Sequence, residues 1–566
     1  MLGSRAVGVI AALALSTAAV AGDVVHLEQN WSPELREQFY FAPQGSHLMP
    51  YEWFLALERS GDQTLFSSPQ NLARFGWLYH DKASPQLNPG RLPIGMTKEP
   101  ATAPGGGTWL GMTCAACHTS DVSHEGKVVR IDGAPAMLDF GSFLGALSSA
   151  VLASNPAVDA EKFKRFAARV HTARPDGPTP EQLAALYQEF AAKFVGRAWM
   201  RTPPLPAGPG RVDALTQIVN SLAVFYLGTP ENLHPPVAPT SFPFLWLTPQ
   251  LDFVQWNPIA SSPIARNAGE ALGVFGEANF GRDPASAPLS STVLFDKLFE
   301  MEQWVDGLSP PKWPEHVFGR IDQTRWRRGA ALFQADCRGC HNMPPFDMTR
   351  KEDNIAGKQF IKITRVPFQS VGTDPQYVQS LVGRFVQTGG LGSTLFGGRA
   401  VVPGAEFFAT TTAAVLRKGL VDAKLSGEQQ LAYNGFRFYP KANPSDPNEQ
   451  LRPWRPPSLT GIKAGPLLGI WATGPFFHNG SVPNLYEVLS PPEQRSQTFW
   501  IGSSELDTQK LGFVSKERAG LFKFDTQLPG NRNVGHAYPK QSYTHEQRLD
   551  VIEFLKDPQR FATTTP

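Results

Sequence analysis

The four cysteines constrain the fold of this chain more than any other feature. All of them lie in two short motifs, CAACH at residues 114–118 and CRGCH at residues 337–341. In a C-x-x-C-H motif, two thiols on one helical turn can form thioether bonds with the vinyl groups of a haem, and the histidine that follows can bind the iron. The motifs therefore predict two covalently bound haem c groups rather than two disulfides. The predicted attachment residues and iron ligands are Cys114, Cys117, His118, Cys337, Cys340 and His341.

The N-terminus has the pattern of a secretory leader. Arg5 precedes an apolar run from Ala6 to Leu15, and Ala19, Val20 and Ala21 form a small-x-small cleavage site. We expect a signal peptide over residues 1–21, cleavage after Ala21, and a periplasmic or secreted protein. The alternative is an uncleaved anchor, but the run is short for a membrane span. No later segment approaches roughly 18 uninterrupted apolar residues, so no stable span is predicted.

The composition is typical of a globular protein. The chain has 566 residues, of which 18% are charged and 42% hydrophobic, and its formal net charge is +2. This balance gives no reason to expect a nucleic-acid partner. Fifty-one glycines and 51 prolines indicate many loops, so compactness would depend on large apolar side chains and bound groups. We expect a mainly α fold with two cytochrome c-like haem domains, large loop-rich insertions and little β structure.

The second motif has the surroundings of a cytochrome c domain. Trp326, Ala330 and Phe333 recur at helical spacing and lead into Cys337. A terminal helix is predicted by the capping box of Thr544 and Gln547 and by the apolar positions after it. We expect these two helices to cross. The proposed domains are an N-terminal haem domain at 22–306, a proline-rich linker at 307–316 and a C-terminal domain at 317–566.

The first motif is preceded by a glycine- and proline-rich segment, which predicts a loop where the second motif has a helix. Helical periodicity returns at 180–200 and 213–227. No sixth iron ligand stands out for this site, which favours an open face on the first iron. The candidates are His80, Met96, Met112, Met137, His171 and Met200.

Methionine and histidine are the usual sixth ligands of haem iron. The last methionine of the chain, Met348, follows His341 so closely that it cannot reach the far face of the second haem. The remaining candidates are His478 and His536, both in glycine-rich loops that allow close approach, and His545, which is expected to face solvent at the start of a helix. Spacing alone does not separate His478 from His536.

Several segments together resemble the dihaem rubber oxygenases and the related exported dihaem dioxygenases of unsaturated fatty acids such as oleate. A more distant resemblance extends to the bacterial dihaem cytochrome c peroxidases. The segments are PQGSHLMPYEWFLALE (43–58), GMTCAACHTS (111–120), VVRIDGAPAMLDF (128–140), GPGRVDALTQIVN (208–220), LTPQLDFVQWNP (247–258), GIWATGPFFHNGSVPNLYEVL (469–489) and GNRNVGHAYP (530–539).

The resemblance implies a role for particular residues. The late histidine of the oxygenases corresponds to His536, which places it ahead of His478 as the second ligand of the C-terminal iron. The peroxidases use a methionine there, and this chain has none. In the oxygenases the first haem keeps an open face, which implies that His118 is its only protein ligand. Aromatic residues line the distal pocket in that family, and the candidates here are Phe242, Phe244, Trp246, Phe253 and Trp256.

Arg130 and Arg211 are candidates for contacts with haem propionates, or alternatively for ordinary ion pairs. The leading hypothesis is an oxidoreductase that activates dioxygen at the N-terminal haem against an apolar, unsaturated substrate. The first alternative is a peroxidase, for which His124 or Glu125 would be the acid–base group. The second is an electron-transfer cytochrome, in which Met200 would close the first iron. A small redox partner protein is a further expectation.

Overall fold

The computed structural model describes residues 24–197, 200, 203–354, 357–433 and 460–560. The predicted signal peptide lies outside these residues. Among the helices of the described ranges, none combines the length and the apolar character that a membrane crossing requires. The α-helices are α1 Pro33–Phe41, α2 Tyr51–Ala56, α3 Pro69–Ala73, α4 Phe140–Ala153, α5 Ala160–Ala173, α6 Pro180–Val195, α8 Ala214–Asn220, α9 Pro263–Gly273, α10 Phe295–Asp306, α11 Glu315–Phe318, α12 Gln323–Asp336, α13 Phe368–Val371, α14 Gln376–Val382, α15 Gly392–Leu395, α16 Gly404–Asp422, α17 Gly427–Tyr433, α18 Leu485–Val488 and α19 His545–Lys556.

The prediction of a mainly α fold with little β structure was wrong. About 40% of the structure is helix and 15% is strand, and the strands of the described residues form seven small sheets spread over both halves of the chain. The sheets are β1 Val25–His26 with β6 Lys127–Asp132 and β5 Thr119–His124; β2 Met49–Pro50 with β4 Thr108–Met112 and β3 Met96–Thr102; β7 Arg211–Val212 with β8 Thr240–Ser241; β9 Thr364–Pro367 with β12 Gly461–Ala464; β10 Phe385–Gln387 with β11 Val401–Pro403; β13 Thr498–Ile501 with β16 Phe522–Asp525; and β14 Leu506–Asp507 with β15 Gly512–Phe513.

The hairpin after CAACH shows why the sequence-based class failed. Strands β5 and β6 pair in antiparallel register and are joined by Glu125 and Gly126, whose φ angles are 48° and 79°. Two positive φ angles are what a type I′ hairpin turn requires. The glycine- and proline-rich segment before CAACH also contains paired strands, β3 and β4, where the sequence predicted a loop. Most of the described strands have six residues or fewer, which leaves little room for a clear alternation of polar and apolar residues.

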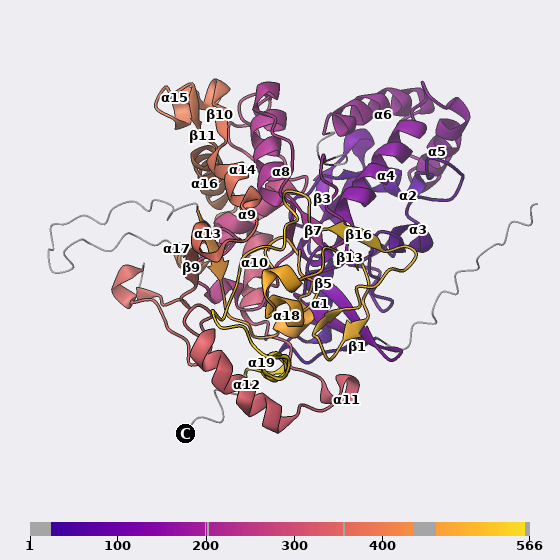
Figure 1. Ribbon diagram of the computed structural model, residues 1–566. Helices are drawn as coiled ribbons and strands as arrows, with labels where there is room; N and C mark the ends of the chain where they lie inside the picture. The colour runs from indigo at the N-terminus through magenta and orange to yellow at the C-terminus, as the bar shows by residue number, and fades with distance from the viewer. Residues whose placement is uncertain (1–23, 198–199, 201–202, 355–356, 434–459, 561–566) are drawn as a thin grey trace, which may run out of the picture.

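The helices gather in separate parts of the molecule. Helices α2, α4, α5 and α6 form the upper right of the view in Figure 1, and α8, α14, α15 and α16 form the upper left. The right-hand group surrounds an aromatic cluster in which Trp53 stacks on Tyr187 at 5.5 Å between ring centroids. The periodic segment at 180–200 corresponds to α6. The segment at 213–227 is α8 followed by a π-helical turn at Ser221–Tyr226.

One large hydrophobic core includes residues from Leu27 to Leu555 and therefore runs through both halves of the chain. This shared core does not indicate two independent haem domains. The proline-rich segment at 307–316 is packed rather than extended in solvent, since Trp313 is 4% exposed and the carbonyl oxygen of Pro311 accepts a hydrogen bond from Trp471 Nε1 at 3.0 Å. A functional boundary at this segment stays a prediction.

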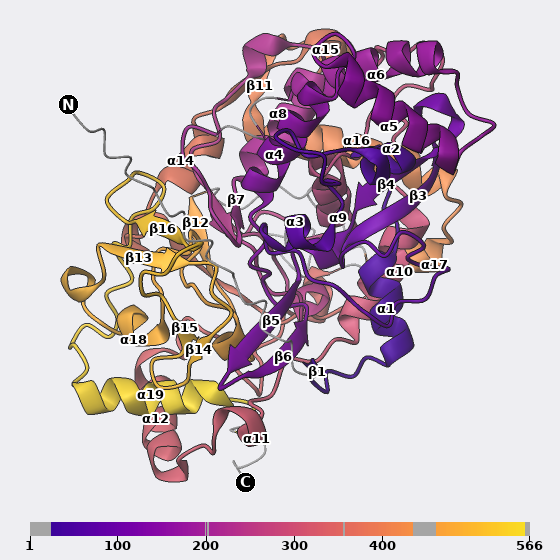
Figure 2. The same cartoon turned by 90° about the vertical axis from the view of Figure 1, so that its right-hand side faces the viewer.

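The two helices expected around the second motif are confirmed. Helix α12 ends directly before Cys337, and α19 begins with the predicted capping box of Thr544 and Gln547. They cross at the lower edge of the molecule, as Figures 1 and 2 both show. Phe554 packs against Trp326 and Phe333, with ring centroids 5.4 and 5.0 Å apart.

The crossing depends on a glycine. A Cβ atom at Gly329 would lie 1.9 Å from the carbonyl oxygen of Asp550, so α19 would have to move. We expect Gly329→Ala to destabilise the protein by about 1–3 kcal/mol, the usual cost of overpacking a core. The midpoint of thermal unfolding should fall. Gly427→Ala is the matched control, because no atom lies within 4 Å of its added Cβ. An equal midpoint in both variants would contradict this reading of the crossing.

Candidate haem sites

The C-terminal motif presents His341 as a metal ligand. Cys337 caps the end of α12, and the backbone N–H of His341 donates to the carbonyl oxygen of Cys337 at 3.0 Å. His341 Nδ1 donates to the carbonyl oxygen of Gly465 at 2.9 Å. A hydrogen bond from Nδ1 fixes the tautomer and leaves Nε2 unprotonated, as metal-bound histidines require. Burial also lowers the pKa of His341, which keeps the ring neutral.

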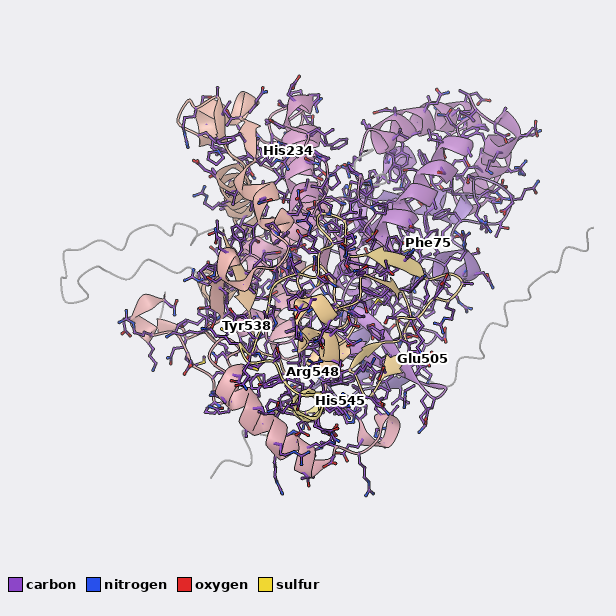
Figure 3. The ribbon with its side chains drawn as sticks, in the orientation of Figure 1. Phe75, His234, Glu505, Tyr538, His545 and Arg548 are labelled. Carbon is purple, nitrogen blue, oxygen red and sulfur yellow. The ribbon has the colours of Figure 1, made fainter. Side chains whose placement is uncertain are left out.

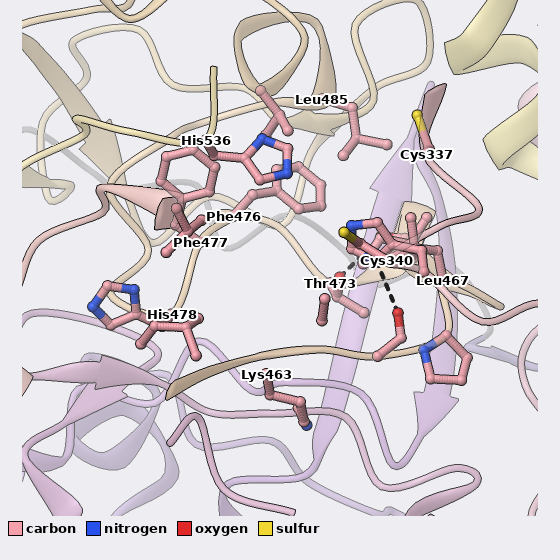
Figure 4. A pocket seen from close by; sticks show the side chains of 18 of the residues that line it. Cys337, Cys340, Lys463, Leu467, Thr473, Phe476, Phe477, His478, Leu485 and His536 are labelled. Carbon is pink, nitrogen blue, oxygen red and sulfur yellow. Dashed lines mark hydrogen bonds between the residues drawn. The ribbon is translucent and has the colours of Figure 1, made fainter. Parts of the chain in front are cut away.

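A cavity of about 300 Å³ lies beside this motif. Its lining includes Cys337, Cys340, His341 and His536, and most of the other lining side chains are apolar (Figure 4). Within the described residues, no cluster of three or more His, Cys, Asp or Glu side chains could hold a metal ion directly. A paired-cysteine motif with one histidine beside an apolar cavity fits a haem, whose own nitrogens supply the remaining iron ligands.

His536 faces His341 across this space. The centroids of the two imidazole rings are 6.4 Å apart. Two imidazoles bound to one metal ion, each at about 2 Å through nitrogen and with about 1 Å more to the ring centre, would have centroids about 6 Å apart. The separation therefore fits two axial ligands of one iron. Burial lowers the pKa of His536 to about 3, and its Nδ1 has no hydrogen-bond partner among the described residues.

The loop that carries His536 is held in an unusual conformation. His536 has a φ of 46°, which few residues other than glycine adopt, and its backbone N–H donates to the carbonyl oxygen of Val371 at 2.6 Å. The guanidinium group of Arg495 donates to the carbonyl oxygens of Gly535 and His536 at 2.8 and 3.2 Å. No local pattern marks Arg495 as a residue that positions this loop, because the two segments meet only in the fold.

The other two histidine candidates are placed differently. His478 borders the same cavity, but the ring that contacts it is that of Tyr377, at 6.0 Å between centroids. Burial lowers the pKa of His478 to about 4. His545 is exposed at the start of α19, where Nδ1 forms a 2.8 Å hydrogen bond with Tyr486 Oη (Figure 3). The geometry thus favours His536 as the partner of His341.

In the N-terminal motif, His118 is held in the same way as His341. Residues Cys114–Ala116 form a short 3-10 turn, and His118 Nδ1 donates to the carbonyl oxygen of Pro243 at 2.8 Å. Burial lowers the pKa of His118 to about 4, so its ring is neutral. The same hydrogen bond from Nδ1 to a distant backbone carbonyl therefore prepares His118 and His341 for the same role.

The aromatic segment after Ser241 lies between the two motifs. Pro243 holds His118, while Phe242 and Phe244 border the cavity beside His341. Phe242 also lies 6.5 Å from the His118 ring, measured between centroids. Trp256 borders the same cavity. The assignment of these aromatic side chains to the distal face of the first haem stays a prediction, since the structure places several of them beside the second motif.

Trp246 and Phe253 are deep in the core. Trp246 is fully buried, and its Nε1 donates to the carbonyl oxygen of Leu468 at 2.8 Å. Phe253 is 2% exposed and lies under the guanidinium group of Arg365 at 4.8 Å. Neither side chain borders the cavity described above. Met200, a candidate sixth ligand of the first iron, is buried in the aromatic N-terminal cluster.

The two arginines proposed for haem propionates have protein partners. Arg130 donates through Nε and Nη2 to the carboxylate of Asp121, at 2.7 and 2.8 Å. Arg211 is fully buried and donates to Asn531 Oδ1 at 2.6 Å, and burial lowers the pKa of Arg211 to about 9. Neither side chain borders the cavity, and their contact with a propionate stays a prediction.

A carboxylate that the sequence did not reveal lies near the first motif. Burial raises the pKa of Cys117, and the negative charge of Glu270 on α9 raises it further. Burial raises the pKa of Glu270 itself, although Gln255 Nε2 donates to its Oε1 at 2.7 Å. By contrast, Glu125 lies at the exposed turn of the β5–β6 hairpin. No local motif marks Glu270, because α9 meets the first motif only through tertiary packing.

A comparison with known protein families supports a haem site at the C-terminal motif. Residues 461–500, which include Gly465 and His478, match a family model described as RoxA-like, cytochrome c-like. The site is that of a cytochrome c-like, haem-dependent oxidoreductase.

Two relatives come from Sinorhizobium fredii. The chain is 34% identical over 568 residues to the uncharacterized protein y4iJ, covering 91% of this chain and 88% of that protein. It is 25% identical over 355 residues to the uncharacterized protein y4iM, covering 59% of this chain and 65% of that protein. The chain belongs to the same protein family as y4iJ.

Proposed function

We propose that this protein is an exported dihaem c-type cytochrome that activates dioxygen at the N-terminal haem and oxygenates or cleaves an unsaturated lipid or isoprenoid. The proposal is supported by the difference between the two sites. His536 lies opposite His341, whereas no second histidine ring in the described part of the chain is set against His118 in the same way. The resemblance to the dihaem oxygenases and the RoxA-like match support the same reaction class.

The two sites would then have different tasks. A haem held by one protein ligand supplies an open face at which dioxygen or peroxide binds, whereas one held by two histidines is suited to electron transfer. The chain keeps His118 neutral and oriented through the carbonyl oxygen of Pro243. Phe242 and Phe244, on either side of Pro243, place apolar side chains at the wall of the cavity beside His341. The C-terminal site would act as an electron reservoir for the N-terminal one.

Peroxide reduction is the second candidate, and Glu270 is the observation that favours it. Cleavage of the peroxide O–O bond needs a group that moves a proton between the two oxygens. Glu270 has a raised pKa, is held by Gln255 and lies close enough to influence the thiols of the first motif. A carboxyl group of this kind could hold or release a proton near a bound ligand.

Oxygen uptake separates the two candidates. We expect the purified mature protein to consume dioxygen when given oleate or polyisoprene, and Glu270→Gln to retain that activity because the oxygenation needs no acid–base group. Peroxide turnover with a reduced electron donor is measured on both proteins in parallel. No oxygen uptake, together with a peroxide turnover that Glu270→Gln lowers by about 10²–10⁴-fold, would reject the dioxygenase in favour of the peroxidase.

A further inference from the structure

The cavity beside His341 has one polar end. Four of its lining residues, Ser241, Thr373, Lys463 and His478, bring polar groups to a mostly apolar lining, and we call them the polar end. Three of their atoms, Ser241 Oγ, Thr373 Oγ1 and His478 Nδ1, are buried without a hydrogen-bond partner among the described residues. Buried polar groups in native proteins are nearly always paired. Several unpaired groups at one cavity wall therefore point to a missing ligand.

Lys463 brings a positive charge to this end. It lies on β12 opposite Arg365 of β9, and its backbone N–H donates to the carbonyl oxygen of Trp256 at 2.9 Å. Its ammonium group lies 5.3 Å from the centre of the Trp256 ring, and no carboxylate pairs with it in the part of the chain that the structure describes. Burial lowers the pKa of Lys463 to about 8. An enclosed ammonium group without a counter-ion is costly, and an anionic ligand would stabilise it.

The residues of the polar end are tied to one another. Trp256 Nε1 donates to the carbonyl oxygen of Ser241 at 2.9 Å, and the backbone N–H of Ser241 donates to the carbonyl oxygen of His478 at 2.9 Å. Lys463, Trp256, Ser241 and His478 thus form a continuous wall. Lys463, Ser241 and His478 take part in these contacts through backbone atoms, so substitution of their side chains leaves the contacts in place.

At the opposite end of the cavity, the carboxylate already has a hydrogen-bond partner. Asp336, beside Cys337, accepts a hydrogen bond from Tyr543 Oη at 2.6 Å. Figure 4 shows His478 and Lys463 on the side of the pocket away from Cys337. A haem c has the same polarity: its vinyl groups bond to the cysteines at one edge, and its two propionate carboxylates project from the opposite edge.

We propose that the polar end binds the propionates of the C-terminal haem, with Lys463 as the counter-charge and with Ser241 and Thr373 as hydrogen-bond donors. This inference rests only on the haem at Cys337, Cys340 and His341 in the proposed function, not on the reaction at the other site. The proposal does not require Arg211, which keeps its hydrogen bond to Asn531.

The test is the midpoint potential of the low-spin haem in Lys463→Met, measured by spectroelectrochemistry on the full mature chain. A nearby positive charge favours the reduced iron, so its removal should lower the equilibrium constant for reduction at least tenfold, which is about 59 mV for a one-electron couple. Lys463→Arg should restore the potential. Lys523→Met is the matched control, because Lys523 also lies on a strand over a tryptophan, 5.9 Å from the ring of Trp500, but not at the cavity.

A second variant tests the proposal independently, in case Lys463→Met does not fold. The double substitution Ser241→Ala and Thr373→Val removes two donors at nearly constant volume, and it should shift the propionate bands in the resonance Raman spectrum while the haem content stays the same. Unchanged potential in Lys463→Met, or unchanged propionate bands in the double variant, would overturn the proposal. A wild-type protein with no haem at CRGCH would overturn both this inference and the cofactor assignment, whereas a failed oxygen-uptake assay would reject the reaction alone.

Discussion

Replacing His536 with glycine is expected to convert the C-terminal haem from low spin to high spin. The rings of His341 and His536 are separated by 6.4 Å between centroids, which fits two axial ligands of one iron. Glycine removes one of these ligands and suits the φ of 46° at this position, so the backbone of the loop is preserved. Electron paramagnetic resonance and absorption spectra of the ferric protein should show the complete loss of one low-spin species.

His478→Gly is the matched control for this substitution. His478 borders the same cavity and is also enclosed by protein, but its ring contacts Tyr377 rather than facing His341. We expect the low-spin signal to remain in His478→Gly, because both rings of the facing His341 and His536 pair are kept. A low-spin spectrum in His536→Gly together with a high-spin one in His478→Gly would transfer the ligand role to His478.

The features that the sequence predicted well are those with a local signal. The stripe of Trp326, Ala330 and Phe333 predicts α12, because three apolar side chains at helical spacing are enough to define a buried face. The capping box of Thr544 and Gln547 predicts the start of α19 for a similar reason. Each signal lies within one turn or a few turns of helix, so no knowledge of the tertiary fold is needed.

The features that the sequence missed depend on contacts between distant segments. The carbonyl oxygens of Pro243 and Gly465, which orient the two candidate iron ligands, are 125 and 124 residues away from them. A backbone carbonyl carries no side-chain signature, so nothing in the sequence marks these two positions. Glu270 and Arg495 belong to the same class, because their roles arise only where α9 and the His536 loop meet their partners.

The two candidate sites hold His118 and His341 in the same way, but they differ in whether a second histidine ring faces the first. Each first histidine donates from Nδ1 to a distant carbonyl oxygen. At the C-terminal site a strained loop, held by Arg495, brings His536 opposite His341. Among the described residues, no comparable loop brings a second histidine ring opposite His118. That asymmetry is the basis for assigning the reaction to the N-terminal site.

Removing each pair of cysteines in turn tests this assignment. We expect Cys114→Ser with Cys117→Ser to retain one covalently bound haem instead of two, to keep the low-spin signal, and to lose substrate-dependent oxygen uptake to the rate without protein. In the proposed function, thioether bonds to Cys114 and Cys117 would hold the reactive haem at His118, whose Nδ1 donates to the carbonyl oxygen of Pro243. Without this tether the haem would not be positioned against the substrate. Haem content is measured by pyridine haemochrome absorbance, and oxygen uptake by an electrode.

Cys337→Ser with Cys340→Ser is the reciprocal variant. This variant should also retain one haem. The low-spin signal of the His341 and His536 pair should disappear, and the haem at CAACH, with its open face, should remain. Binding of carbon monoxide to the reduced protein separates the two variants, and only this one should bind it. If the variant without the first cysteine pair binds carbon monoxide and consumes dioxygen instead, the open iron lies at CRGCH. The roles of the two sites would then have to be exchanged.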